Sequence, residues 1–342
     1  MKELLRRLCS LPGVASWEDQ VRDCVMEVAG QYATELRVDT MGNVIAFKEG
    51  TKATGNKLLL TAHMDEVGLM VRAITDEGYL KFSAVGSVDR RVLLGKRMLV
   101  GPRQIPAVVG MKAYHLVSRD EEKNVPKLDE FYLDIGAKNK EEAAKLVNLG
   151  DVAAFDSPPE EPVPGLLKGR ALDGRIGCAV LLWLMREDLP MDCTFVFTAQ
   201  KEVGARGAFG AAFSVKPEIA LVLEGAPAAD LAGVPAHKKV CALGKGAVLP
   251  VMDKGVIVDR KLFETLRSLA QEGNIPWQLR EEATTGSGDA LAVQRAASGV
   301  RTAVIAAPVR YPHTPATLAN AADIEAVLKL TRAFITQMSK ED

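Results

Sequence analysis

Residues 57–68 read KLLLTAHMDEVG. The continuous apolar run before His63 predicts a strand buried on both faces, as in the centre of an α/β sheet. His63 and Asp65 then follow at the carboxyl end of that strand. Ligand sites in open α/β sheets form outside the carboxyl ends of the strands. The stretch therefore predicts both an α/β fold and the edge of the sheet at which to look for a site.

The same pattern returns later in the chain. CTFVFTAQ (193–200), IALVLE (219–224) and RTAVIAAP (301–308) are short apolar runs typical of buried strands, and helical patterns cover 175–187, 260–273 and 319–340. Strands that alternate with helices of this length indicate an α/β layered sheet. Near the start, residues 16–32 have helical spacing with Ser16 as the expected N-cap, and residues 35–50 form a hairpin pattern around a turn at 41–43.

The middle of the chain has a different sequence pattern from the rest. Residues 71–163 contain short β-type runs broken by Gly, Pro and charged turns, with one helical pattern at 138–150. We expect a sheet or small barrel inserted into a discontinuous α/β domain. The predicted division is 1–70 plus 164–342 for the α/β domain and 71–163 for the insertion.

Composition excludes several classes of protein. The formal net charge is −1 and aromatic residues make up 5%, which disfavours a dedicated nucleic-acid binder. No apolar run reaches the ~20 residues that span a bilayer, and the first residues lack a signal-peptide pattern. The five cysteines are scattered without a CxxC pair, which indicates free thiols and a cytoplasmic location.

Polar side chains follow five predicted strand or helix ends. They are His63, Asp173 at the start of a helix, Glu202 after Lys201, Glu224 and His313. Two imidazoles and three carboxylates form an N/O ligand set suited to one or two divalent ions such as Zn²⁺, Co²⁺ or Mn²⁺. Each residue also has a simpler explanation, for example Asp173 as an N-cap or His313 as a surface-loop histidine.

Four segments carry a family resemblance. They are HMDEVG (63–68), ALDGRIG (171–177), QKEVGARGA (200–208) and RYPHTP (310–315), and further blocks such as FYLDIGAKNKEEA (131–143), LGKGAVLPVMDKG (243–255) and TTGSGDALAV (284–293) also match. The chain resembles the M42 metalloaminopeptidases over nearly its whole length, with the matching segments in the same order. That family includes glutamyl and tetrahedral aminopeptidases, and some members have an endoglucanase label.

The resemblance implies a mixed-sheet α/β/α metallopeptidase domain with an inserted, barrel-like β-rich dimerisation domain. It implies two divalent ions, with His63 and Glu224 on one, Glu202 and His313 on the other, and Asp173 bridging them. Asp65 would accept the second ring N–H of His63 and fix its tautomer. Short peptides would be the substrates, and the chain would form a homo-oligomer between a dimer and a dodecamer.

The main departure from the family pattern is Lys201, where the family has a general-base Glu. A charged ammonium accepts no proton, and losing a general base costs on the order of 10²–10⁴ in rate. The lysine could be neutral and carry protons, could replace the charge of one ion and leave a site for a single metal, or could point away from a damaged site. Glu224 also replaces the usual Asp, Gly174 the usual Asn, and Gly288 a Thr or Asn.

Three functions follow as hypotheses. The first is a metal-dependent aminopeptidase acting on short peptides, impaired by Lys201. The second is a catalytically silent or altered homologue that binds peptides or serves as an assembly subunit. The third, glycoside hydrolysis, needs two carboxylates that flank a sugar, whereas the carboxylates here are better explained as metal ligands.

Overall fold

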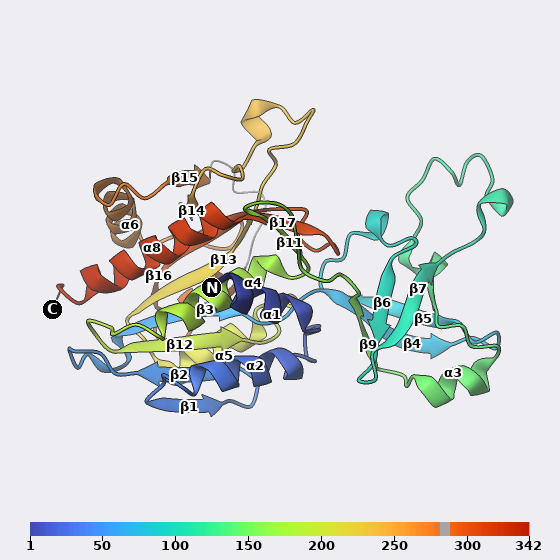
Figure 1. The fold of residues 1–342 in the computed structure, drawn as a ribbon, viewed down its shortest axis with the longest axis horizontal. Helices are drawn as coiled ribbons and strands as arrows, with labels where there is room; N and C mark the ends of the chain where they lie inside the picture. The colour runs from blue at the N-terminus through green and yellow to red at the C-terminus, as the bar shows by residue number, and fades with distance from the viewer. Residues whose placement is uncertain (281–287, 342) are drawn as a thin grey trace.

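The computed structural model describes residues 1–280 and 288–341. Figure 1 shows two parts side by side: a layered α/β part that contains both termini, and a smaller β-rich part formed by the middle of the chain. The predicted combination of a mixed sheet with an inserted barrel is confirmed.

The α/β part is built on one twisted sheet of mixed strand direction. Its main path runs in the order β1 (Glu35–Val38), β2 (Val44–Lys48), β12 (Cys193–Thr198), β3 (Leu58–His63), β13 (Ile219–Pro227), β16 (Arg301–Arg310), β17 (Thr317–Asn320), β11 (Leu166–Gly169) and β10 (Glu160–Val163). β14 (Ala247–Pro250) pairs with β16 and with β15 (Trp277–Arg280). The four central strands β12, β3, β13 and β16 are parallel, so their carboxyl ends lie at one edge.

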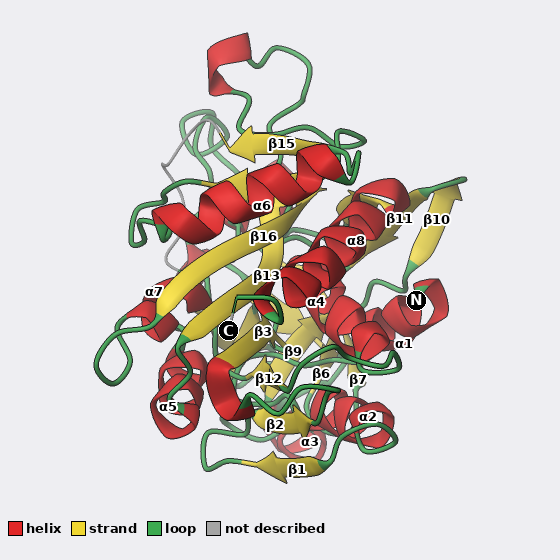
Figure 2. Cartoon of the chain, turned by 90° about the vertical axis from the view of Figure 1, so that its left-hand side faces the viewer, coloured by secondary structure: helices red, strands yellow, loops and turns green. Residues whose placement is uncertain are grey.

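Helices cover both faces of this sheet, as Figure 2 shows. One face packs against α1 (Lys2–Ser10), α2 (Asp19–Ala29), α4 (Leu172–Leu184), α6 (Arg260–Glu272) and α8 (Ala321–Met338), and the other against α5 (Arg206–Val215) and α7 (Asp289–Gln294). The strand β3 serves both layers, because Leu58 and Leu60 lie in the first core and Leu59 in the second. This double burial explains why the sequence of β3 is apolar without alternation.

The middle segment closes into a six-stranded antiparallel barrel. Its strands follow the order β4 (Gly68–Ile74), β5 (Leu80–Val85), β8 (Tyr132–Asp134), β7 (Ile105–Gly110), β6 (Arg97–Val100) and β9 (Val152–Phe155), and α3 (Lys140–Leu146) packs beside β4. The barrel has its own core, which includes Leu69, Phe82, Met98 and Leu133. It therefore buries apolar side chains independently of the sheet.

Local details differ from the sequence expectations at one helix start. The N-cap of α2 is Glu18, not Ser16, whose φ is 74° and whose amide donates to the Glu18 carboxylate. All five cysteines are free and buried. Among the described residues, no helix combines the length and apolar character needed to cross a membrane.

Candidate metal centre

Four segments bring their polar side chains together at the carboxyl edge of the parallel strands. His63 ends β3, Glu202 follows β12, Asp173 is the second residue of α4, and His313 follows β16. One ligand atom of each of His63, Asp173 and Glu202 lies within 4.8 Å of the others. His313 Nε2 lies 3.3 Å from Glu202 Oε2 and 3.7 Å from Asp173 Oδ2. The structure thus places four of the predicted ligands in one cluster.

The backbone is in an unfavourable conformation at the turns that present these side chains. Ala171, Gln200, Tyr311 and His313 all have φ between 55° and 61°. A left-handed conformation costs a residue with a Cβ about 1 kcal/mol or more, and such costs collect at functional sites. Ala171 is the N-cap of α4, so Asp173 lies inside the first turn and is not the cap.

Asp65 anchors the turn after β12. Its Oδ1 accepts the Lys201 amide at 2.9 Å and its Oδ2 accepts the Glu202 amide at 2.8 Å. His63 Nδ1 lies 3.2 Å from the Asp65 carbonyl oxygen and 3.6 Å from Asp65 Oδ1. The nearer acceptor for the ring N–H is therefore the carbonyl, and the carboxylate fixes the backbone that carries Lys201 and Glu202.

Each histidine turns its Nε2 toward the cluster. His313 Nδ1 lies 3.0 Å from the Ser87 carbonyl oxygen, so it donates a proton there and leaves Nε2 with a lone pair. The same assignment at His63 leaves its Nε2 buried, with no hydrogen-bond partner in the described chain. Neutral imidazole nitrogens held in this way are typical metal ligands.

Two buried atoms in the cluster lack partners. Within the described residues, neither His63 Nε2 nor Glu202 Oε1 makes a hydrogen bond. A buried polar group without a partner costs about 1–3 kcal/mol. Both atoms are electron-pair donors, so each is suited to a cation as its partner.

The spacing fits a divalent ion at one position. Zinc bonds of about 2.0–2.1 Å in tetrahedral geometry place ligand atoms about 3.4 Å apart. The separations from His313 Nε2 to Glu202 Oε2 and Asp173 Oδ2, 3.3 and 3.7 Å, lie on either side of that value. His313 Nε2 therefore stands at metal-ligand spacing from both the Asp173 and the Glu202 carboxylate.

Lys201 points into the cluster and not away from it. Its side chain is 16% exposed, and Nζ lies 3.8 Å from Glu202 Oε1 and 4.0 Å from Asp173 Oδ2, longer than hydrogen bonds. Burial alone would lower the Lys201 pKa, but the surrounding carboxylates, with Glu202 and Asp173 first, outweigh burial and raise it. The structure therefore favours an ammonium over the neutral lysine.

The pKa values of the neighbouring groups reflect the Lys201 charge and their own burial. Burial would raise the Glu202 pKa, but the Lys201 ammonium and His313 hold it well below its usual range. Burial lowers the pKa of each of the two histidines, and the nearby carboxylates outweigh that effect and raise both. Burial raises the Glu224 pKa despite the attraction of Lys201.

A cavity of about 630 Å³ opens beside the cluster. The predicted site residues in its wall are Asp173, Lys201, Glu202, Glu224 and His313, and the rest of the wall includes Ser87, Lys254, Arg280 and Gly288. Glu224 thus lines the same space as the cluster, although its carboxylate is not part of the 4.8 Å group.

Two glycines give room to site side chains. A Cβ at Gly288 would lie 2.5 Å from Glu224 Oε2, and a Cβ at Gly174 would lie 2.5 Å from His63 Cε1 and 2.6 Å from the His63 carbonyl oxygen. The long Glu224 and the observed orientation of His63 therefore both depend on glycine at the facing position.

Sequence reasoning missed two residues of the site. Asp289 begins α7, is buried, accepts a 2.5 Å hydrogen bond from Thr198 Oγ1, and leaves Oδ1 without a partner among the described residues. Its signal was an acidic residue within the matching block at 284–293. Ser87 contributes only a backbone carbonyl, for which the sequence has no signal.

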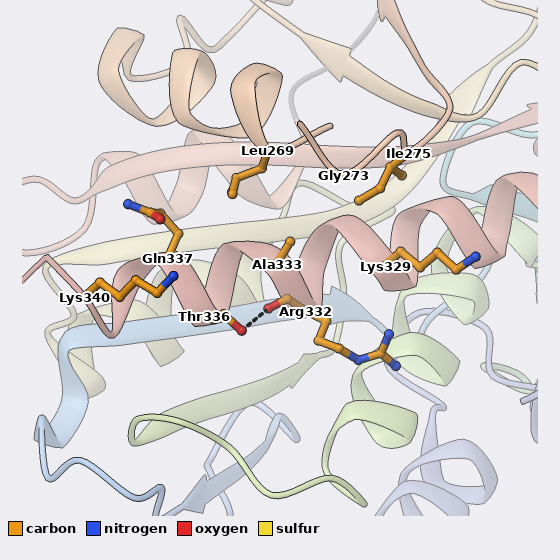
Figure 3. Close-up of a pocket in the computed structure, with 9 residues that line it drawn as sticks. All are labelled: Leu269, Gly273, Ile275, Lys329, Arg332, Ala333, Thr336, Gln337 and Lys340. Atoms are coloured by element: carbon orange, nitrogen blue, oxygen red, sulfur yellow. Dashed lines mark hydrogen bonds between the residues drawn. The ribbon is translucent and has the colours of Figure 1, made fainter. Parts of the chain in front are cut away.

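A second hollow lies elsewhere on the α/β part. It has a volume of about 380 Å³ and lies between α6 and α8, where Leu269, Ile275 and Ala333 form part of its wall (Figure 3). None of the predicted site residues lines it, so the cavity at the carboxyl edge is the candidate active site.

Comparison with known proteins agrees with this location. The family model described as M42 glutamyl aminopeptidase matches residues 42–330. The chain belongs to the M42 glutamyl aminopeptidase family. The M42 match spans the sheet strands that carry the cluster and the whole barrel.

Several relatives with solved structures or curated names are described as aminopeptidases. The chain is 37% identical to a putative aminopeptidase of Acetivibrio thermocellus, over 96% of this chain and 97% of the relative. It is 32% identical to a TET aminopeptidase from a marine sediment archaeon of the Thaumarchaeota, with a TM-score of 0.94 and coverage of 98% and 96%. A TET peptidase of Pyrococcus horikoshii, described as able to assemble into a tetrahedron or a large octahedral shell, is 30% identical with a TM-score of 0.86 and coverage of 97% and 98%.

Proposed function

We propose that this M42 protein is a metal-dependent aminopeptidase that removes N-terminal residues from short peptides. Its rate is low because Lys201 stands where a general base is needed. The observation that carries the proposal is the convergence of Asp173, Glu202 and His313 at metal-ligand spacing beside a cavity of about 630 Å³. The aminopeptidase names of its relatives support the reaction type.

The site residues have different proposed roles. Asp173, Glu202 and His313, with His63 nearby, would hold the divalent metal, which supplies Lewis-acid polarisation of the carbonyl and an acidified water. Glu224 lines the cavity and offers a carboxylate to the free α-ammonium of the peptide. The Lys201 ammonium places a positive charge where the carbonyl oxygen becomes negative.

Removal of a proton from the attacking water is the step that Lys201 slows. No proton leaves the attacking water to Lys201 while that side chain is an ammonium. The loss of a positioned base costs about 10²–10⁴ in rate. We therefore expect activity well below that of a chain with a carboxylate at position 201.

The test is release of amino acids from a panel of aminoacyl and dipeptide substrates with Zn²⁺, Co²⁺ or Mn²⁺. We expect slow turnover that chelation abolishes. Glu202→Ala is the control, because it removes a proposed ligand. Turnover no greater than that of Glu202→Ala on every substrate would reject the proposal.

Lys201 also favours a second candidate function, a silent homologue that binds peptides without cleaving them. Lys201→Glu separates the two. A gain of about 10²-fold or more shows that only the base was missing. Peptide binding without turnover in both forms of the chain would support the silent homologue instead.

We also propose that the protein self-associates through the inserted segment at 71–163. Support comes from the tetrahedral and octahedral assemblies described for the Pyrococcus horikoshii peptidase. The division into an α/β domain of 1–70 plus 164–342 and an insertion at 71–163 is part of this proposal.

A further inference from the structure

We propose that this chain holds one divalent ion, at Asp173, Glu202 and His313, and that the Lys201 ammonium takes the place of a second ion on the side of His63 and Glu224. The proposal rests on the metal dependence proposed above. It adds the number of ions and their position.

The first support is the position of the ammonium. Nζ lies 3.8 Å from Glu202 Oε1 and 4.0 Å from Asp173 Oδ2. An ion bound at about 2.1 Å to either oxygen would therefore lie within about 6 Å of Nζ. The ammonium is close enough to share these carboxylates with one ion and to repel another.

The second support is charge balance. Three carboxylates line the cavity at the cluster, those of Asp173, Glu202 and Glu224. Lysine is positively charged near neutral pH, so the ammonium and one divalent ion together carry three positive charges. A second divalent ion would bring the positive charge to five against these three carboxylates, in a buried space where repulsion is poorly screened. Two more buried carboxylates lie nearby but are not in the cavity wall: Asp65, which accepts from two amides, and Asp289, which accepts from Thr198.

The third support is that the unusual residues lie on one side of the site. Gly174 faces the His63 ring, and Gly288 faces the Glu224 carboxylate. Lys201, Glu224 and these two glycines are the departures found in the sequence, whereas Asp173, Glu202 and His313 keep the family residue. The departures other than Lys201 are thus Glu224 itself and the glycines that face His63 and Glu224.

The number of ions can be counted on the intact protein without substrate. The protein is stripped with a chelator, titrated with Zn²⁺ or Mn²⁺ by calorimetry, and analysed for bound metal after dialysis. We expect about one ion per wild-type chain and two per Lys201→Glu chain. Lys254→Glu is the matched control, because it makes the same charge change in the wall of the same cavity, and it should leave the count at one.

Ligand variants locate the single ion. His313→Ala should lose it, and His63→Ala should keep it, with circular dichroism melts showing that both variants fold. Two ions per wild-type chain, or loss of the ion in His63→Ala but not in His313→Ala, would overturn the inference while leaving metal dependence intact. A wild-type chain that binds no ion would overturn both.

Discussion

At the scale of single residues, the site depends on two glycines, because neither has a side chain. Gly288 and Gly174 have functions only through the space that they leave to Glu224 and His63. The two cases differ in kind. The closest atom to a Cβ at 288 is the end of a flexible side chain, whereas a Cβ at 174 would also meet the His63 backbone.

We therefore predict that Gly288→Ala weakens the binding of a dipeptide at least several-fold with little change in melting temperature, because Glu224 moves and the fold does not. Adding Glu224→Asp should recover part of the loss, since the shorter carboxylate avoids the new methyl group. Calorimetric dissociation constants for the wild type, both single variants and the double variant form a thermodynamic cycle. If the two effects simply add, the glycine does not act through Glu224.

At the scale of elements, the end of β16 is fixed by a paired charge. Arg310 donates to Asp230 through Nε at 2.7 Å and Nη2 at 2.6 Å, and Asp230 also accepts the Leu243 amide. This bidentate contact lies three residues before His313. It holds the strand end from which the histidine segment departs.

The Asp230–Arg310 contact gives a pH prediction. The hydrogen bond from Arg310 lowers the Asp230 pKa, so its stabilisation is present above the unfolded value near 3.8 and is lost as pH falls through the lower folded value. Asp230→Asn should cost about 1.5–3 kcal/mol at pH 7, measured by urea unfolding, and the difference should shrink below pH 4. Asp120→Asn, which removes an exposed ion pair with Lys123, should have almost no effect.

The elements that the sequence predicted best are those whose burial pattern is unambiguous. The strand 58–63 ends at His63 as expected, and α6 and α8 follow their helical patterns within a few residues. The helix α5 was not foreseen, because its glycines and alanines give little periodicity. The same reasoning located the proposed ligand residues at strand or helix ends, but not the Ser87 carbonyl, because a backbone contact has no residue type to mark it.

At the scale of the whole molecule, apolar side chains are exposed on the barrel part. Leu94, Tyr114, Leu116 and Leu149 are 55–77% exposed. Clusters of exposed apolar residues mark interaction surfaces. The proposed self-association through this segment would cover some of them.

We predict a solution mass of at least two chains of 36.8 kDa each by light scattering. Tyr114→Asp combined with Leu116→Asp should lower that mass, because each change puts a charge on the proposed contact. Ile257→Asp, at an equally exposed apolar position outside the barrel, is the control and should leave the mass unchanged. A wild-type monomer would contradict the prediction.

The hydrogen bond between the Ser87 carbonyl and the His313 ring joins a barrel loop to a segment of the sheet. If the barrel shifts by about 1 Å against the sheet, the bond must break or the imidazole must rotate, and displacements of that size change rates substantially. Such a shift would follow if separating the subunits of an assembled protein moved the barrel. Dilution alone would then change the orientation of the His313 ring relative to Asp173 and Glu202. The oligomeric state would in this way control the reaction within each subunit.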